Sequence, residues 1–157
     1  MVIKRNLKNM RSGRLTLGVV SAAVMAGALV ASSPAVAATD PAAPRIHTAA
    51  EGEAPPAALI GPNGEKPIRW GVATFDAGSG PITKASVGGG TWHYGTAKAD
   101  GGYKKCYSNY IHPSKKHSAS VAIGSKTAKD VKGPDIWAKA SQTSGWAYKC
   151  NTYWGVY

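Results

Sequence analysis

Apolar and polar positions alternate through much of the second half of the chain. In HSASVAIG, Ala119, Val121 and Ile123 fall on one side of an extended backbone. GWAYKCNTYWGVY alternates in the same way, and one face would carry Trp146, Tyr148, Cys150, Thr152, Trp154 and Val156. A period of two predicts β-strands. The aromatic face of the second segment is predicted to point inward.

Shorter segments extend this pattern. TWHY and GYKKCYSNYIH are predicted strands rich in aromatic residues, and PIRWGVATFDAG is compatible with one more. AKDVKGPDIWAKASQ is divided by Gly133-Pro134, so we expect a loop followed by a strand over 136–140. Short strands separated by Gly and Pro turns predict an all-β fold, a small sandwich or barrel. The alternation also predicts a core that includes Trp92, Val121, Ile123, Trp137, Tyr148 and Trp154.

The N-terminal residues have the pattern of a secretory signal. A cationic leader precedes an uncharged apolar run over 15–31, and Ala35-Val36-Ala37 supplies small residues for a peptidase. We predict a signal peptide over 1–37, cleaved after Ala37, and a secreted protein. The alternative is a membrane anchor, but the apolar run is near the lower limit for a span.

Residues 38–85 are predicted to be a Pro/Ala/Gly-rich linker or pro-segment, mostly disordered. Such a composition buries too little apolar surface to fold alone. The ordered domain is expected over 86–157, and the mature chain begins at Ala38 or near Ser86.

Charge and cysteines describe this domain further. The whole chain has a formal net charge of +11, and residues 86–157 hold ten Lys, no Arg and three Asp, which gives 10 − 3 = +7. Cys106 and Cys150 are the only cysteines. In an oxidising compartment such a pair predicts a disulfide.

Metal and catalytic chemistry are both disfavoured. His93, His112 and His117 would need a fourth ligand to hold zinc, and Cys106 is available only outside a disulfide. No Glu follows Glu65, which makes paired carboxylates hard to assemble. We therefore expect no metal, no cofactor and no catalytic residues.

With metal and catalytic functions disfavoured, we expect a binding function. Residues 86–157 contain four of the five Trp and all seven Tyr, interleaved with lysines. Tyrosine rings stack on sugars or sit at interfaces, while lysines neutralise phosphate. Nucleic acid would suit a cytosolic protein, whereas an exported chain meets anionic envelope polymers or lipid-linked precursors. The alternative is that the lysine pairs form only a solvated face.

Several motifs occur together in a recognisable order. GGGTWHYG, CYSNYIHPSKKHSASV, IWAKA and the terminal YWGVY resemble the lactococcin 972 family of bacteriocins over about Gly88 to Tyr157. The resemblance implies a β-sandwich of two antiparallel sheets. It also implies growth inhibition of related Gram-positive bacteria, by binding lipid II and blocking septum formation without pores.

The expected partners are lipid II or another anionic cell-envelope component and an immunity transporter in the producer. A homodimer is left open. Nucleic acid is not expected. The alternative function is a secreted, non-toxic module that binds the cell envelope or a glycan.

The residues favoured for target binding flank CYSNYIHPS. A hairpin through 109–113 would bring two exposed lysine pairs to one end of the sandwich, with tyrosines beside them. The predicted contact residues are Lys104, Lys105, Tyr107, Tyr110, Lys115 and Lys116.

Overall fold

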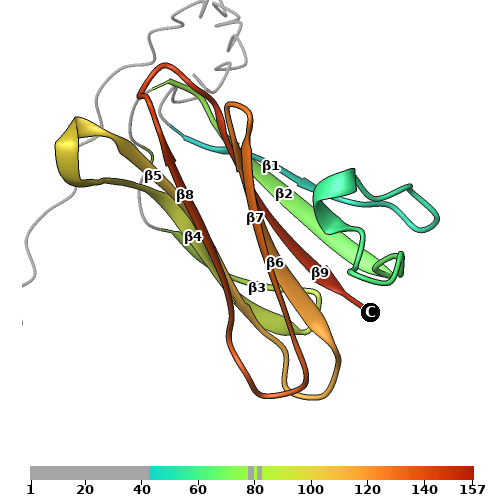
Figure 1. Ribbon diagram of the computed structural model, residues 1–157. Coiled ribbons are helices and arrows are strands. Elements are labelled where there is room, and N and C mark those ends of the chain that lie inside the picture. The colour runs from blue at the N-terminus through green and yellow to red at the C-terminus, as the bar shows by residue number, and fades with distance from the viewer. Residues whose placement is uncertain (1–42, 78–79, 81–82) are drawn as a thin grey trace, which may run out of the picture. The chain divides into compact units, whose positions relative to one another are not determined.

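A computed structural model describes residues 43–77, 80 and 83–157 of the chain. These residues form two antiparallel sheets that pack face to face (Figure 1). The predicted all-β sandwich is confirmed. The predicted signal peptide lies outside the described residues. No helix in the described part of the chain has the length and apolar character to cross a bilayer.

The first sheet has five strands in the order β1-β2-β9-β6-β7. Their bounds are β1 Arg45–Thr48, β2 Arg69–Phe75, β9 Cys150–Val156, β6 His117–Ile123 and β7 Lys126–Lys132. The second sheet has the order β3-β4-β5-β8. Its strands are β3 Thr83–Val87, β4 Gly90–Lys98, β5 Lys104–Ile111 and β8 Ala138–Ser144. Two short 3₁₀ turns, η1 Ala57–Leu59 and η2 Asp100–Gly102, complete the described elements.

Aromatic rings fill the space between the sheets. Trp92 stacks on Tyr94 with ring centres 3.6 Å apart. The Trp92 indole N–H donates to the Ser108 hydroxyl over 2.8 Å, and that hydroxyl donates to the Tyr153 carbonyl of the other sheet over 2.7 Å. The polar atoms of this core are therefore paired across the two layers, as buried polar groups require.

The predicted core is correct in four of its six members. Trp92, Val121, Ile123 and Trp154 are buried. Trp137 is only half-buried, because it precedes β8 and its ring turns outward to lie against His93. Tyr148 is 53% exposed, because it lies in the loop before β9, where the strand alternation has not begun.

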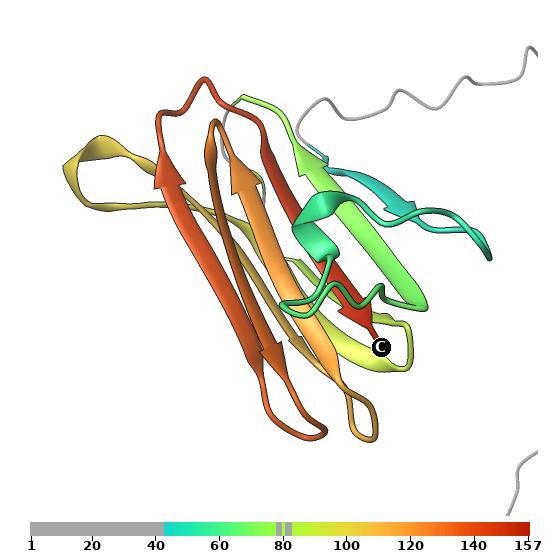
Figure 2. The same cartoon turned by 45° about the vertical axis from the view of Figure 1, so that its right-hand side comes forward.

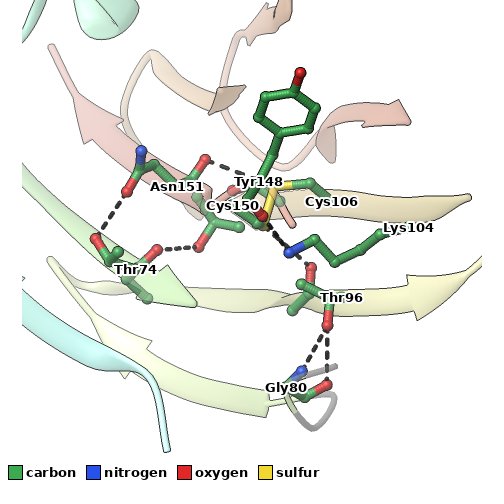
Figure 3. Close-up of a disulfide and its surroundings, with 12 residues drawn as sticks. Thr74, Gly80, Thr96, Lys104, Cys106, Tyr148, Cys150 and Asn151 are labelled. Atoms are coloured by element: carbon green, nitrogen blue, oxygen red, sulfur yellow. Dashed lines mark hydrogen bonds between the residues drawn. A yellow bond between two sulfur atoms is a disulfide. The ribbon is translucent and has the colours of Figure 1, made fainter. Parts of the chain in front are cut away.

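The predicted disulfide is confirmed. Cys106 of β5 and Cys150 of β9 are bonded, with 5.7 Å between their Cα atoms, and both are fully buried (Figure 3). Because β5 and β9 belong to different sheets, the bond joins the two layers through the core.

Two predicted connections are wrong. The segment after β5 does not form a hairpin, since β5 pairs with β4 and β8, and residues 112–116 carry the chain across to the other sheet. Part of the expected loop in AKDVKGPDIWAKASQ is instead β7, which pairs with β6. Figures 1 and 2 show β7 beside β8 along one edge of the sandwich. There the Asp130 carboxylate accepts the Lys139 backbone N–H over 2.9 Å.

Residues 38–85 differ most from expectation. Their described part is not a disordered linker but contributes β1, η1, β2 and most of β3. β2 pairs with β9 along its whole length, and Leu59 and Phe75 are buried. The prediction failed because composition tests whether a segment folds alone, whereas this one is completed by strands far along the chain.

Candidate target-binding face

The outer face of the first sheet is already occupied. The segment 49–68, here called the strap, crosses it over β6 and β9 (Figure 2). Leu59 of the strap is fully buried, and its carbonyl accepts the Tyr157 hydroxyl over 2.7 Å. The Lys129 ammonium donates to the Ile60 carbonyl. This face is closed to a large partner while the strap is in place.

The outer face of the second sheet is different, because its outward side chains are exposed or half-buried and no described segment covers them. We call it the open face. One row crosses all four strands in register and consists of Lys84, His93, Asn109 and Lys139. The next two rows add Gly95, Tyr107 and Ser141, then Ala97, Lys105 and Thr143.

The open face has an unbalanced charge. The strands β3, β4, β5 and β8 contain five Lys and no Asp or Glu. Three of these lysines point outward: Lys84, Lys105 and Lys139. None of the three takes part in the ion pairs found within residues 43–77, 80 and 83–157. The face therefore presents ammonium groups that are free to meet an anion.

Aromatic rings lie among these lysines. Trp137 and His93 are in contact, with ring centres 5.0 Å apart. Tyr107 lines a shallow hollow of about 460 Å³ together with Lys105, Asn109 and Lys139. The Tyr107 hydroxyl and the His93 Nε2 are shielded from solvent, and neither has a hydrogen-bond partner within the described residues. Burial raises the pKa of Tyr107, so the ring stays neutral.

Two of the six predicted contact residues lie on this face. Lys105 and Tyr107 point outward from β5 and line the same hollow. Lys104 was expected to be exposed but is fully buried, and its ammonium donates to the carbonyls of Tyr148 and, over 3.4 Å, Asp76. Burial lowers the pKa of Lys104. This side chain stabilises the fold and is inaccessible to a target.

Tyr110 is also a core residue. Its ring is fully buried and its hydroxyl donates to the Val87 carbonyl over 2.9 Å. Burial raises the pKa of Tyr110 well above its usual value. The burial of Lys104 and Tyr110 was predictable from the sequence. Even numbers of residues separate Lys104, Cys106 and Tyr110, so their side chains lie on the same face of the strand. If Cys106 is inward, the other two are inward as well.

The second predicted lysine pair is exposed but distant from the first. Lys115 and Lys116 follow the far end of β5, whose eight residues from Lys104 to Ile111 span about 25 Å. Lys116 pairs with Glu65 of the strap and lies 5.5 Å from the Tyr157 ring centre. The expected single patch of four lysines does not form, because residues 112–116 leave the second sheet.

Two of the three candidate metal-binding histidines, His112 and His117, serve the fold. Both ring nitrogens of His117 lie 2.8 Å from carbonyl oxygens, those of Lys115 and Ile136. The Nδ1 of His112 accepts the backbone N–H groups of Ser114 and Lys115 over 3.2 and 3.1 Å. Nowhere in the described ranges do three His, Cys, Asp or Glu side chains gather as metal ligands.

We expect His112 to make stability depend on pH. Burial, together with the charge of His117, lowers its pKa below the ordinary 6.5, and Lys115 and Arg69 act in the same direction. The unfolded chain is then protonated first, so stability is full above about pH 6.5 and falls as the pH drops towards the folded-state pKa. Denaturant unfolding from about pH 7.5 to about pH 5 should show this loss. His112→Asn should have a lower free energy of unfolding at the higher pH and a smaller loss on acidification. Parallel losses in both proteins would contradict the assignment.

Several open-face residues escaped prediction. Alternation in GTWHY and WAKAS is sufficient to place His93 and Lys139 outward once Trp92 and Ala138 are known to be inward. Lys84 was assigned to the linker. The cross-strand register that aligns Lys84, His93 and Lys139 is a tertiary property, and alternation along one strand does not contain it.

One family model matches part of the chain. The family model described as Bacteriocin (Lactococcin_972) matches residues 88–154, which confirms the resemblance noted in the sequence. The match relates residues 88–154, which are 67 of the 157 residues of the chain, to a family of antibacterial proteins. No curated protein and no solved structure matches the chain. The match covers β4 to β9 nearly completely but leaves out β1, β2, β3 and the strap.

Proposed function

We propose that this protein inhibits related Gram-positive bacteria by binding lipid II through its open face, and that the bound precursor is withheld from septum formation. The observation that carries the proposal is the row of Lys84, His93, Asn109 and Lys139 across a sheet whose strands hold no carboxylate. Lipid II offers a pyrophosphate to such lysines and a disaccharide to neighbouring aromatic rings.

The polar atoms of the open face support a sugar-bearing target. A shielded polar group without a hydrogen bond costs about 1–3 kcal/mol. The Tyr107 hydroxyl and the His93 Nε2 are both in this state. A ligand with hydroxyl and amide groups, reaching them past the flexible lysine chains, would recover part of that cost. Trp137, half-buried against His93, supplies a ring on which a sugar can stack.

The test compares two triple variants of residues 38–157. The first is Lys84→Gln, Lys105→Gln and Lys139→Gln, which removes the outward charges of the open face. The second is Lys66→Gln, Lys115→Gln and Lys116→Gln, which removes the same charge from exposed positions elsewhere and includes one of the two lysine pairs favoured by sequence. All six side chains are on the surface, so both variants should fold.

The open-face variant should lose about tenfold or more in affinity for vesicles that contain lipid II, since each lysine near an anionic surface contributes about 1 kcal/mol. It should also lose division arrest in sensitive cells. The affinity of the control variant should change less than about threefold. Binding of the parent should weaken as salt is added, because the Debye length falls to about 8 Å at physiological ionic strength. An equal loss of affinity in both variants would show that the lysines act only through the net charge of the protein, and not through a site on the open face. A parent that binds cell walls without arresting growth would support the non-toxic binding module instead.

A further inference from the structure

A second surface of the molecule is unexplained by lipid II binding. Two loops meet at one end of the sandwich, residues 99–103 between β4 and β5 and residues 145–149 between β8 and β9. The Trp146 indole N–H donates to the Gly102 carbonyl over 2.7 Å and ties the loops together. Tyr103 and Tyr148 are 55% and 53% exposed, whereas the other Trp, Tyr and Phe side chains are buried or half-buried. We call Tyr103, Trp146 and Tyr148 the aromatic end.

These rings are held on a firm base. The Tyr148 carbonyl accepts the buried Lys104 ammonium, and the disulfide of Cys150 follows two residues later. Figure 3 shows the Tyr148 ring directed away from both. A Cβ added at Gly124 would lie 3.3 Å from the Tyr148 ring, so the ring rests on the turn between β6 and β7. Its backbone is fixed while much of its side chain remains in solvent.

The charges around the aromatic end favour an anionic partner. Lys98, Lys126 and Lys149 stand at the ends of the strands and loops that meet here. The described acids nearby are Asp76 and Asp100, and Asp76 is already paired with Arg45 over 2.5 Å and with Lys149 over 3.7 Å. Lysines therefore outnumber the free carboxylates beside these rings.

We propose that the aromatic end docks in the headgroup region of an anionic phospholipid bilayer. Tyr and Trp have an apolar body and a polar tip, which suits the membrane–water interface, and lysines beside them attract acidic lipids. Tyr103, Trp146 and Tyr148 do not line the hollow formed by Lys105 and Tyr107, so they are separate from the proposed lipid II site.

Docking by the aromatic end would orient the strands roughly perpendicular to the bilayer plane. Lys105 is the second residue of β5 and lies close to the loop 99–103, so it is among the open-face lysines nearest the lipid surface. Where the proposed function holds, this orientation brings the hollow lined by Lys105 and Tyr107 to the level of the headgroups. The phosphates of a lipid-linked precursor lie at that level.

The test uses residues 38–157 and vesicles without lipid II, so its result does not depend on the proposed function. The parent should sediment with vesicles of phosphatidylcholine and phosphatidylglycerol and bind pure phosphatidylcholine more weakly. The variant Tyr103→Ser with Tyr148→Ser should bind the anionic vesicles about tenfold more weakly, while the doubly Phe-substituted variant keeps most of the binding. The matched control is Ile46→Ser with Ile68→Ser, which removes two exposed apolar side chains elsewhere and should change binding less than about twofold.

Unchanged binding by the double Ser variant would overturn the proposal, as would an equal loss in the Ile control. Thermal unfolding of each variant checks the fold, and the Phe variant separates a lost ring from a disturbed loop. If the parent binds only vesicles that contain lipid II, the aromatic end is not a membrane anchor. The open face would then be the sole contact with the target.

Discussion

A chain truncated to residues 86–157 should show no cooperative unfolding transition, whereas residues 38–157 should unfold in a single step. The truncation removes β1, β2, most of β3 and the strap. Leu59, Trp70 and Phe75, all buried, would be lost with them. Burial of one such side chain stabilises by about 1.5–3 kcal/mol, so the three together provide about 5–9 kcal/mol, comparable with the whole stability of a small domain.

A shorter deletion is the control for this experiment. A chain that begins at residue 43 retains every described element and should melt as the 38–157 chain does. Heat- and denaturant-induced unfolding, followed by tryptophan fluorescence, gives the comparison. A native-like transition in the 86–157 chain would contradict the result and show that the family-matching part folds without the strands that precede it.

Removal of the disulfide should have the next largest effect. Cys106→Ala with Cys150→Ala should lower the free energy of unfolding by about 4 kcal/mol, because the bond closes a loop of 44 residues in the unfolded chain. The bond also joins the two sheets, so its loss removes a covalent link between the layers of the core. Denaturant unfolding measures the change from the transition midpoint and slope.

The reduced parent protein is the matched comparison, because it keeps both sulfur atoms in the core and isolates the effect of the bond from that of lost packing. It should lose nearly as much stability as the double Ala variant. Thiol titration of the denatured, unreduced parent should find no free thiol. Two titratable thiols, or an unchanged midpoint after reduction, would contradict the role assigned to this bond.

Strand faces were predictable from the sequence, but strand partners were not. Alternation placed Val121, Ile123 and Trp154 correctly, because a period of two acts within one strand. The assignment of Lys115 beside Lys105 required knowing whether β5 and β6 pair. β5 and β6 belong to different sheets and do not pair. Which strands pair depends on the packing of all the described strands.

The candidate site was also predicted only in part. Tyr107 and Lys105 were identified from composition and position, and both lie on the open face. Lys104 was misjudged, because a lysine is rarely buried without a carboxylate partner. Its contacts are the backbone carbonyls of Asp76 and Tyr148. Both residues are distant in the sequence, so the residues around Lys104 give no indication of them.

The position of β9 between β2 and β6 has a consequence for the order in which the protein is made. β9 is synthesised after the other eight strands, yet β2 and β6 bond to it and not to each other. Phe75 pairs with Cys150, so β2 must wait for about 75 further residues before its central partner exists. The first sheet, the strap and the disulfide can therefore form only after β9 has emerged. A nascent chain without β9 can pair β1 with β2, β6 with β7 and the strands of the second sheet, but it cannot join β2 to β6 across the first sheet.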